Sequence, residues 1–571
     1  MFPPVVLASL TLWALGHDAS AADAPRLWPQ AKSVSYSSHP TLLPLAASFS
    51  WRIEGGAENI LQAALTRLQF SNGKGKRGNC TSVEASSALH RGIIIVESTS
   101  RSLRGADESY ELQVAASGGI EINATTTWGA LHALTSLKQL VVQIDNCPAI
   151  NAVHIQDAPR FAHRGVMLDP SRNFIPMSLL EKVVDGMSEL KLNVLHLDLV
   201  NAPSFPFVAP SHPEFAAAGA YSTSEVYSKV DLTDLVAYGK ARGVALLLEV
   251  DTPGHAYSWG LATPTLTTCA GLDDQYSLNC PEPPCGYLDM RSEAAVSTVL
   301  EVLLDVVQIA RSGEEEGGAF AIHIGADEVS TECFGENETA PLFRNWVASI
   351  TSSMAEAPGG VAPTLHAWME AWSSMGADAL TPANSVLQFW GNAAVWDGSE
   401  EAAASIAQQH EQLHAALNAG FSVVSSNASA WYLDCGAGNF LTGDASWCDP
   451  YKSWQHALAA DPAHNVSAAQ APQVLGGELC LWGEQTDATN LESKLWHRAA
   501  AGAERLWAAE SSIAECTVPV RLPLNECWKD AQDRLRRVEA RFQAAGFAFA
   551  PSQPKFCSQR PEYCDAFYGD S

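Results

Sequence analysis

The chain has 571 residues, a formal net charge of −29 and a pI near 4.8, with 47% hydrophobic and 17% charged residues. This length exceeds that of one ordinary domain, and the composition is that of a globular protein with a large core. The excess of acidic residues argues against nucleic acid and anionic membranes as partners.

Residues 1–22 have the pattern of a secretory signal peptide. A short apolar run at 5–15 is followed by Ala19-Ser20-Ala21, a small-x-small cleavage pattern, although no positive charge precedes the run. An uncleaved anchor is the alternative, but the run is short for a membrane span. We therefore expect the secretory pathway, ending in a lysosome, a vacuole or the extracellular space, and no membrane span after cleavage.

Sequons and cysteines agree with export. Thirteen cysteines leave one thiol unpaired, for which we choose Cys480, because it lies in the apolar run "VLGGELCLW". No CxxC occurs, so zinc binding by cysteines is a weak alternative. The pattern predicts small disulfide loops in an oxidising compartment. The sequons are at Asn79, Asn123, Asn337, Asn427 and Asn465, and the close cysteine pairs are Cys280/Cys285, Cys435/Cys448, Cys516/Cys527 and Cys557/Cys564.

The sequence pattern of residues 25–157 predicts a small α+β domain. Apolar stretches at 91–98 and 109–124 have the composition of strands, and "TWGALHALTSLKQLV" at 127–141 has that of a helix.

Residues 160–510 alternate between short apolar runs and helical segments, the chief of which are 178–191, 231–243, 293–312 and 399–420. Eight such units predict a (β/α)8 barrel with long loops, so the fold class is α/β, a TIM-type barrel after a small α+β domain. Residues 511–571 form a cysteine-bearing tail with one helix at 528–546, packed on the barrel. The apolar runs end at Asp169, Asn201, His255, Glu328, Glu370, Trp390, Tyr432 and Glu484.

Active-site residues of such barrels lie where the strands end. Loops are polar in any protein, but this does not explain three Trp and a Tyr at such ends. Aromatic faces with carboxylates and an Arg at one mouth indicate a sugar pocket. The residues concerned are Asp169, Arg172, Asn201, His255, Asp327, Glu328, Trp368, Trp390, Tyr432, Trp482 and Glu484.

Asp327 and Glu328 are adjacent acids at the end of the apolar run "GAFAIHIGADE". Two carboxylates this close raise at least one pKa, and burial raises it further. We expect one acid to keep its proton near neutral pH while the other stays ionised, as glycoside cleavage requires. A magnesium or zinc site with His323 as third ligand is the alternative, but the spacing does not force it. An acidic surface pair without a role would not close an apolar strand.

Around these acids the sequence resembles glycoside hydrolase family 20, the β-N-acetylhexosaminidases. "HIGADE" is similar to the His-x-Gly-Gly-Asp-Glu signature of that family. Further blocks follow in family order: "FAHRGVMLDPSRNFIP", "SFPF", "EVDTPGHAYSWG", "WYLDCG" and "GGELCLWGEQTDATNL". "RLWPQAKSV" and "TTWGALHAL" resemble the N-terminal domain, so the resemblance covers nearly the whole mature chain.

The resemblance implies a retaining exo-hydrolase that removes terminal β-linked GlcNAc or GalNAc through an oxazolinium intermediate, without metal or cofactor. Glu328 would be the general acid and base, and Asp327 would orient the acetamido group, whose carbonyl Tyr432 would bind. His255 would contact Glu328. The substrate-binding residues would be Arg172, Asn201, Trp368, Trp390, Asp434, Trp482 and Glu484.

One strand departs from the family pattern His-Trp-His-x-x-Asp-Asp. Here it reads "HLDLVNA", so Asp198 replaces a His, and Asn201 and Ala202 replace two acids. We expect Asn201 to hydrogen-bond a neutral His255, which weakens the proton transfer at Glu328. Ala326 replaces a signature Gly and is expected to crowd the acids mildly.

This departure motivates an alternative, a catalytically impaired glycan-binding protein. The expected partner is in either case an oligosaccharide or glycoconjugate with a terminal N-acetylhexosamine. Family members are often homodimers, but no sequence feature fixes the oligomeric state. Cys80–Cys147 and Cys269–Cys333 would complete six disulfides.

Overall fold

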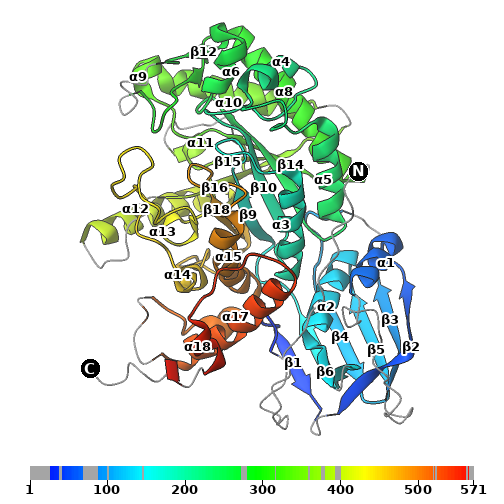
Figure 1. The fold of residues 1–571 in the computed structure, drawn as a ribbon. Coiled ribbons are helices and arrows are strands. Elements are labelled where there is room, and N and C mark those ends of the chain that lie inside the picture. Colours follow the sequence, from blue (N-terminus) through cyan, green and yellow to red (C-terminus); the bar gives the residue numbers. More distant parts are fainter. Residues whose placement is uncertain are drawn as a thin grey trace.

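The computed structural model describes residues 26–37, 41–68, 88–98, 102–144, 147–271, 279–315, 317–357, 360–373, 380–391, 400–518, 520, 524–560 and 563–564. The expected signal peptide, Asn79 and Cys80 lie outside these ranges. The described residues form a small sheet domain, a closed barrel and a helical C-terminal segment that lies against the barrel (Figure 1).

The N-terminal region is an eight-stranded sheet in the order β1-β8-β4-β5-β3-β2-β7-β6, with two helices. Thr126 caps the second helix by accepting from the Gly129 N–H, as expected where an apolar helix begins after a strand. Most of that helix is buried, and its His132 ring lies 4.9 Å from the Trp507 ring of the barrel. The elements are β1 Ser33–Tyr36, β2 Leu42–Glu54, α1 Glu58–Arg67, β3 Leu89–Val96, β4 Tyr110–Ala115, β5 Gly119–Ala124, α2 Thr127–Leu140, β6 Val142–Ile144, β7 Cys147–Asn151 and β8 Val153–Asp157.

Eight parallel strands close the barrel in the order β10-β11-β14-β15-β16-β17-β18-β9. They are buried along nearly their whole length, which is why they read as continuous apolar runs in the sequence. The fold class expected from the sequence is therefore confirmed. The strands are β9 His163–Leu168, β10 Val194–Val200, β11 Ala245–Thr252, β14 Ala321–Gly325, β15 Thr364–Trp368, β16 Ser385–Phe389, β17 Ser422–Ser425 and β18 Val474–Leu481.

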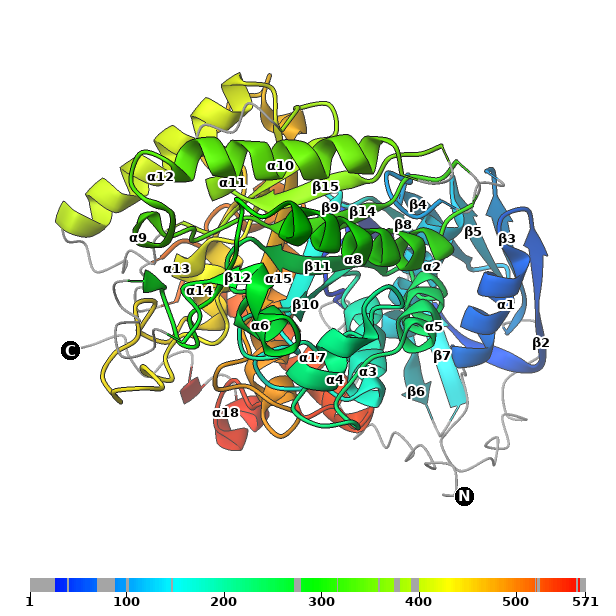
Figure 2. The same ribbon diagram turned by 90° about the horizontal axis from the view of Figure 1, so that it is seen from above.

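Helices surround this barrel, as the view from above shows (Figure 2). Local signals fix their starts: Ser228 and Asp231 form a capping box on α5, and Ser292 caps α8. The long helices are α3 Met177–Glu189, α5 Lys229–Lys240, α8 Glu293–Ser312, α10 Thr339–Ala355, α12 Glu400–Asn418 and α15 Leu491–Trp507. The short loop elements are α4 Pro213–Gly219, α6 Tyr257–Ala262, β12 Thr267–Thr268, β13 Tyr287–Leu288, α9 Thr331–Phe334, α11 Glu370–Ser373, α13 Ala428–Trp431 and α14 Trp454–Ala459.

The C-terminal segment packs on α15. Arg534 of α17 pairs with the buried Glu504 of α15 at 2.7 Å, and the Trp528 ring lies 5.6 Å from the Trp454 ring. This agrees with the tail and helix expected from the sequence. Its elements are α16 Glu510–Ile513, α17 Glu526–Ala544 and α18 Lys555–Gln559.

The disulfides follow the predicted pairing wherever both cysteines are described. Cys480 is the free, buried cysteine of the described residues, as expected. Cys147 is disulfide-bonded, and its expected partner Cys80 lies outside the described residues. The bridges are Cys269–Cys333, Cys280–Cys285, Cys435–Cys448, Cys516–Cys527 and Cys557–Cys564.

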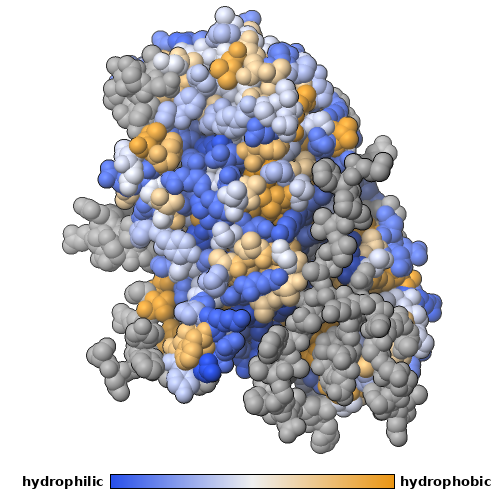
Figure 3. Space-filling view, in the orientation of Figure 1, coloured by the Kyte–Doolittle hydropathy of each residue, from blue (hydrophilic) through white to orange (hydrophobic). Residues whose placement is uncertain are grey.

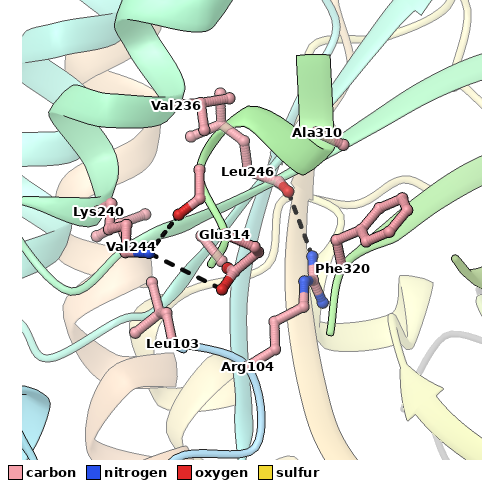
Figure 4. A pocket seen from close by; sticks show the side chains of 11 residues that line it. Leu103, Arg104, Val236, Lys240, Val244, Leu246, Ala310, Glu314 and Phe320 are labelled. Carbon is pink, nitrogen blue, oxygen red and sulfur yellow. Dashed lines mark hydrogen bonds and ion pairs between the residues drawn. The ribbon is translucent and has the colours of Figure 1, made fainter. Parts of the chain in front are cut away.

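A small cavity of about 20 Å³ lies between the sheet domain and the barrel (Figure 4). Arg104 reaches into it from the sheet domain and donates to the Leu246 carbonyl at 3.3 Å, and Glu314 lies 3.9 Å from the Lys240 ammonium. Leu246 lies at the N-terminal end of β11 and Phe320 directly precedes β14, so this cavity is at the opposite end of the barrel from the predicted site. It has room for about one water molecule.

The surface in the view of Figure 3 is mixed, with hydrophilic residues between small hydrophobic groups. In the described part of the chain, every helix is too short or too polar to cross a membrane.

Candidate active site

The two adjacent acids follow β14 in a tight, left-handed turn. Gly325, Ala326 and Glu328 have φ angles of 67°, 74° and 51°, so the alternation of a strand ends and both carboxylates enter the barrel mouth. Gly325 is required, because a Cβ there would lie 1.8 Å from a carboxylate oxygen of Asp251. The expected crowding at Ala326 is instead a backbone effect, since left-handed φ angles cost roughly 1 kcal/mol outside glycine.

Asp327 lies at the bottom of the mouth and is 8% exposed. Its Oδ1 is buried without a hydrogen-bond partner in the described residues. Burial, together with the charges of Glu328 and Glu249, raises the pKa of Asp327 to about 7, although His255 acts in the opposite direction. The acid whose pKa is raised is therefore Asp327, whereas the family resemblance gives the proton-donating role to Glu328.

Glu328 occupies a more open position. Its side chain is 32% exposed, and its Oε2 lies 3.1 Å from Nε2 of His255. Burial works against a charge on His255, but the hydrogen bond to Glu328 and the charge of Asp327 outweigh it and raise the His255 pKa. The two carboxyl groups thus differ in burial and in hydrogen-bond partner, so they can serve different steps of a reaction.

Aromatic rings surround the acids. Trp482 lies between Trp368 and Tyr432, with ring centres 5.9 Å and 6.1 Å away. Trp390 and Tyr432 both contact Trp447 edge-on, at 5.5 Å and 5.7 Å. The structure therefore brings the three predicted Trp and the Tyr into one cluster.

Tyr432 does not end a strand, contrary to the prediction from "FSVVSSNASAWY". β17 ends at Ser425, and the short helix α13 follows. Asn427 causes this change, because its side-chain oxygen accepts from the Ser429 N–H and starts the helix. Tyr432 then pairs with Cys480 of β18 through an isolated bridge.

Arg172 lies over the face of Trp482, with its guanidinium carbon 4.9 Å from the ring centre. It contacts the Asp169 carboxylate at 3.0 Å and Glu484 at 3.2 Å, and it donates to Glu282 at 2.6 Å. The guanidinium is thus fixed in a fork of carboxylates beside an aromatic face, an arrangement suited to sugar hydroxyls.

Asp434 extends this polar group. Burial raises its pKa to about 6, while Arg498 and Lys494 act in the opposite direction. Its charge also contributes to the raised pKa of Glu484. The structure therefore places both predicted binding acids on one side of the pocket.

Asn201 does not bind His255, which corrects the expectation from the sequence. Its amide donates to Asp198 at 2.7 Å and lies 3.5 Å from an oxygen of Asp251. Asp198 also lies 3.8 Å from Arg172. Asp198 of β10 and Asn201, which follows this strand, therefore form a group with Asp251 and Arg172.

Four residues near the site were missed by the sequence reasoning. The sequence did contain a signal for Asp251, because it is a further acid at the end of an apolar run that predicts a buried strand. Glu282 had none, because it lies in the Cys280–Cys285 loop, outside any periodic pattern. The other two are Glu370, which accepts from the Trp390 indole at 3.1 Å, and Trp447.

His323 belongs to a different group from the acid pair. It faces Glu249 inside the barrel at 2.8 Å, so the considered site of His323, Asp327 and Glu328 is not assembled. Within the described residues, donor atoms lie within 4.8 Å of one another in three groups. These are Asp251–His255–Asp327, His196–Glu249–His323 and Asp434–Cys435–Cys448, the last with both cysteines in a disulfide.

A (β/α)8 barrel with paired acids in an aromatic mouth is the architecture of a glycoside hydrolase. The family model "Glycosyl hydrolase family 20, catalytic domain" matches residues 161–510, and "beta-acetyl hexosaminidase like" matches residues 27–140. The chain therefore belongs to glycosyl hydrolase family 20, and its activity is that of a β-hexosaminidase.

Relatives of known name cover most of the chain. A probable β-hexosaminidase of Drosophila melanogaster is 32% identical over 88% of this chain and 74% of its own length. β-Hexosaminidase 3 of Arabidopsis thaliana is 31% identical over 97% and 98%. A chitobiase of Flavobacterium johnsoniae shares the fold with a TM-score of 0.70 at 22% identity, covering 94% of this chain and 75% of that one.

Proposed function

We propose that the protein is a retaining exo-β-N-acetylhexosaminidase that removes terminal β-linked GlcNAc or GalNAc by substrate-assisted catalysis. The observation that carries this proposal is the unequal environment of the two acids. Asp327 is buried at the bottom of the aromatic cluster, whereas Glu328 is a third exposed and bound to His255. A solved relative from Vibrio harveyi, an exo-β-N-acetylglucosaminidase, holds N-acetylglucosamine.

In the first step, the 2-acetamido oxygen of the substrate attacks the anomeric carbon as the glycosidic bond breaks. Glu328 gives its proton to the leaving oxygen, and the sugar becomes an oxazolinium ion. In the second step, Glu328 takes a proton from water, whose oxygen attacks the anomeric carbon on the face that the leaving group vacated, and the bond between the anomeric carbon and the acetamido oxygen breaks. The product therefore keeps its β configuration.

Asp327 stabilises the positive charge that develops on the acetamido group. It accepts the acetamido N–H, and this donor together with the positive charge favours the ionised carboxylate of Asp327. The Tyr432 hydroxyl binds the acetamido carbonyl from the other side of the cluster. Preorganised groups of this kind supply about 3–4 kcal/mol each in comparable enzymes.

The remaining residues hold the sugar. Trp368, Trp390 and Trp482 enclose the ring, and Arg172, Glu484 and Asp434 bind hydroxyl groups. Because His255 bonds to the open acid Glu328, it fixes that side chain and exchanges its proton.

The proposal also includes the substrate and the cellular compartment. The substrate is an oligosaccharide or glycoconjugate with a terminal N-acetylhexosamine, and the protein acts in the secretory pathway, in a lysosome or vacuole or outside the cell. The five disulfides among the described residues support an oxidising compartment.

A glycan-binding protein without turnover is the second candidate, favoured by the absence of an Asn201–His255 bond between these two described residues. Release of nitrophenol from its β-N-acetylglucosaminide separates the two. Glu328→Gln should lower kcat by about 100-fold or more, because the proton donor is lost. Glu332→Gln, an exposed change on α9, is the matched control and should keep wild-type turnover. If the wild type is no faster than Glu328→Gln but binds N-acetylglucosamine, the second candidate is correct.

A further inference from the structure

The barrel interior beneath the pocket contains a layer of ionisable side chains. Barrels of this kind are usually filled by branched apolar residues, and a buried charge is costly unless it is paired. Each of these residues is at most 5% exposed. The layer consists of His163, His196, Glu249, His323, His366 and Glu478.

His196 lies between two carboxylates of this layer. Its Nδ1 is 2.8 Å from Glu478, and its Nε2 is 2.9 Å from Oε2 of Glu249. Only the Nδ1 contact is a hydrogen bond, so the Nε2 contact with Glu249 is favourable as an ion pair when the ring carries two protons. Consistent with this geometry, the two carboxylates overcome burial and raise the His196 pKa to about 10.

Glu249 connects this layer to the pocket. Its Oε1 accepts from the Trp368 indole N–H at 3.0 Å, while Oε2 faces His196. Trp368 in turn lies 5.9 Å from Trp482 in the cluster around the acids. The protonated His196 therefore holds the Glu249 carboxylate on one side. On the other side, Glu249 holds the Trp368 indole of the pocket in place.

We propose that Glu249 is a positioning residue of the active site: ionised against His196, it fixes the Trp368 indole and places a negative charge beneath Asp327. The inference deepens the proposed function and rests on it for the role of Asp327. Glu249 belongs to β11, and Asp327 follows the adjacent β14, so the charge acts across neighbouring strands.

The charge of Glu249 acts on Asp327 among several other groups, each of which is unchanged in the variants below. Asp251 and His255 face Asp327 from β11 and its loop, and Glu328 is adjacent. The others are Tyr287, Glu370 and Tyr432.

The test separates position from charge. Glu249→Gln keeps the shape and removes the charge, Glu249→Asp keeps the charge and shortens the reach to the indole, and Trp368→Phe removes the N–H. Calorimetry with N-acetylglucosamine measures affinity without turnover, so it holds even if the protein proves not to hydrolyse. We expect Glu249→Asp and Trp368→Phe each to weaken binding about tenfold, and their double variant to be no weaker than either.

The pH profile of kcat/KM supplies the second readout. Loss of the Glu249 charge lets Asp327 ionise at lower pH, so Glu249→Gln should move the acid limb down by on the order of half a pH unit. Glu249→Asp should leave that limb in place. Glu478→Gln should also leave the acid limb in place. It removes the second carboxylate that contacts His196, but Glu478 contacts neither Trp368 nor Asp327.

Two results would overturn the proposal. One is additive losses of affinity in the Glu249→Asp and Trp368→Phe pair, since the carboxylate would then not act through the ring. The other is a stoichiometric divalent metal in the purified wild type that Glu249→Gln abolishes, because His196, Glu249 and His323 would then be its ligands rather than an ion-paired layer. If Glu249→Gln does not fold, the calorimetry of Glu249→Asp and Trp368→Phe decides alone.

Discussion

Asn201 donates its amide to Asp198 at 2.7 Å and lies 3.5 Å from Asp251, so a neutral side chain separates two buried carboxylates. Burial and the charge of Glu249 raise the pKa of both acids well above the usual range. Relative to the family pattern, an acid, Asp198, stands in place of a His near the end of β10, and an amide, Asn201, stands in place of an acid just after it. These replacements reverse the simple expectation that restoring one family residue improves the enzyme.

Asn201→Asp alone should therefore harm the protein. It replaces the shared amide donor with a third acid beside Asp198 and Asp251, and an unpaired charge on any of these buried groups costs about 3 kcal/mol. We expect kcat/KM to fall more than tenfold and Tm to drop. The double variant Asp198→His/Asn201→Asp should recover most of both, because the histidine gives the new acid a partner.

Steady-state kinetics and thermal unfolding of the two single variants and the double variant measure this coupling. A single Asn201→Asp variant as active as the wild type would contradict the account, since Asp198 and Asp251 would then tolerate a third charge. Additive single effects would contradict it as well.

At the scale of an element, the loop between α13 and α14 shapes the pocket rim. The Cys435–Cys448 disulfide closes this loop, and Trp447 next to it is 58% exposed while its ring contacts Trp390 and Tyr432. An exposed Trp against two pocket rings offers a face to whatever group is attached to the terminal sugar.

Trp447→Ala should raise KM for a β-linked disaccharide of N-acetylglucosamine about fivefold, which corresponds to the loss of about 1 kcal/mol of ring contact. kcat should stay near the wild-type value, and inhibition by free N-acetylglucosamine should not change, because that sugar fills only the inner position. Trp447→Phe is the control and should keep most of the affinity. Equal weakening of both ligands would show instead that the loop has collapsed onto the pocket.

The elements that could be predicted are those whose burial is complete. All eight barrel strands were found because parallel strands covered on both faces are continuous apolar runs, and α8 was found from end to end. β17 was extended too far, because "SSNASAWY" is apolar enough for a strand and the cap by Asn427 is a single side-chain contact. Glu282 was not predicted for a related reason. It lies in a loop, and its contact partner is decided by the folded chain rather than by any periodic pattern in the local sequence.

The positions of the candidate site residues followed from the sequence better than their contacts did. Asp327, Glu328 and His255 lie together as the motifs implied. The buried layer below them was invisible, because His196, Glu249 and Glu478 occur singly in apolar strands far apart in the sequence. Only the closed barrel brings them to within hydrogen-bond distance.

At the scale of the whole molecule, buried acids determine how stability depends on pH. Burial is the largest cause that raises the pKa of Asp327 to about 7, of Glu370 to about 8 and of Asp434 to about 6. In the unfolded chain these groups ionise near pH 4. Between pH 4 and 8 these three acids therefore bind more protons in the folded protein, so their contribution to stability falls as pH rises through that window. The buried His366 and His497, whose pKa burial lowers, act in the opposite direction below about pH 6.5.

We expect Tm to be a few °C higher at pH 5 than at pH 8. The net charge of −29 adds repulsion with the same sign, so a second comparison is needed to isolate the buried acids. The variant Asp327→Asn/Glu370→Gln removes two of them and should flatten the dependence, whereas Glu332→Gln/Glu338→Gln removes two exposed charges and should leave it nearly unchanged. Below pH 4 stability should fall again, because Glu108, whose pKa is lowered to about 2 by Arg164 and His132 against the effect of burial, loses its ion pairs there. Differential scanning calorimetry from pH 3 to 9 measures the whole curve, and an equally steep fall from pH 5 to 8 in both double variants would assign the effect to surface repulsion instead.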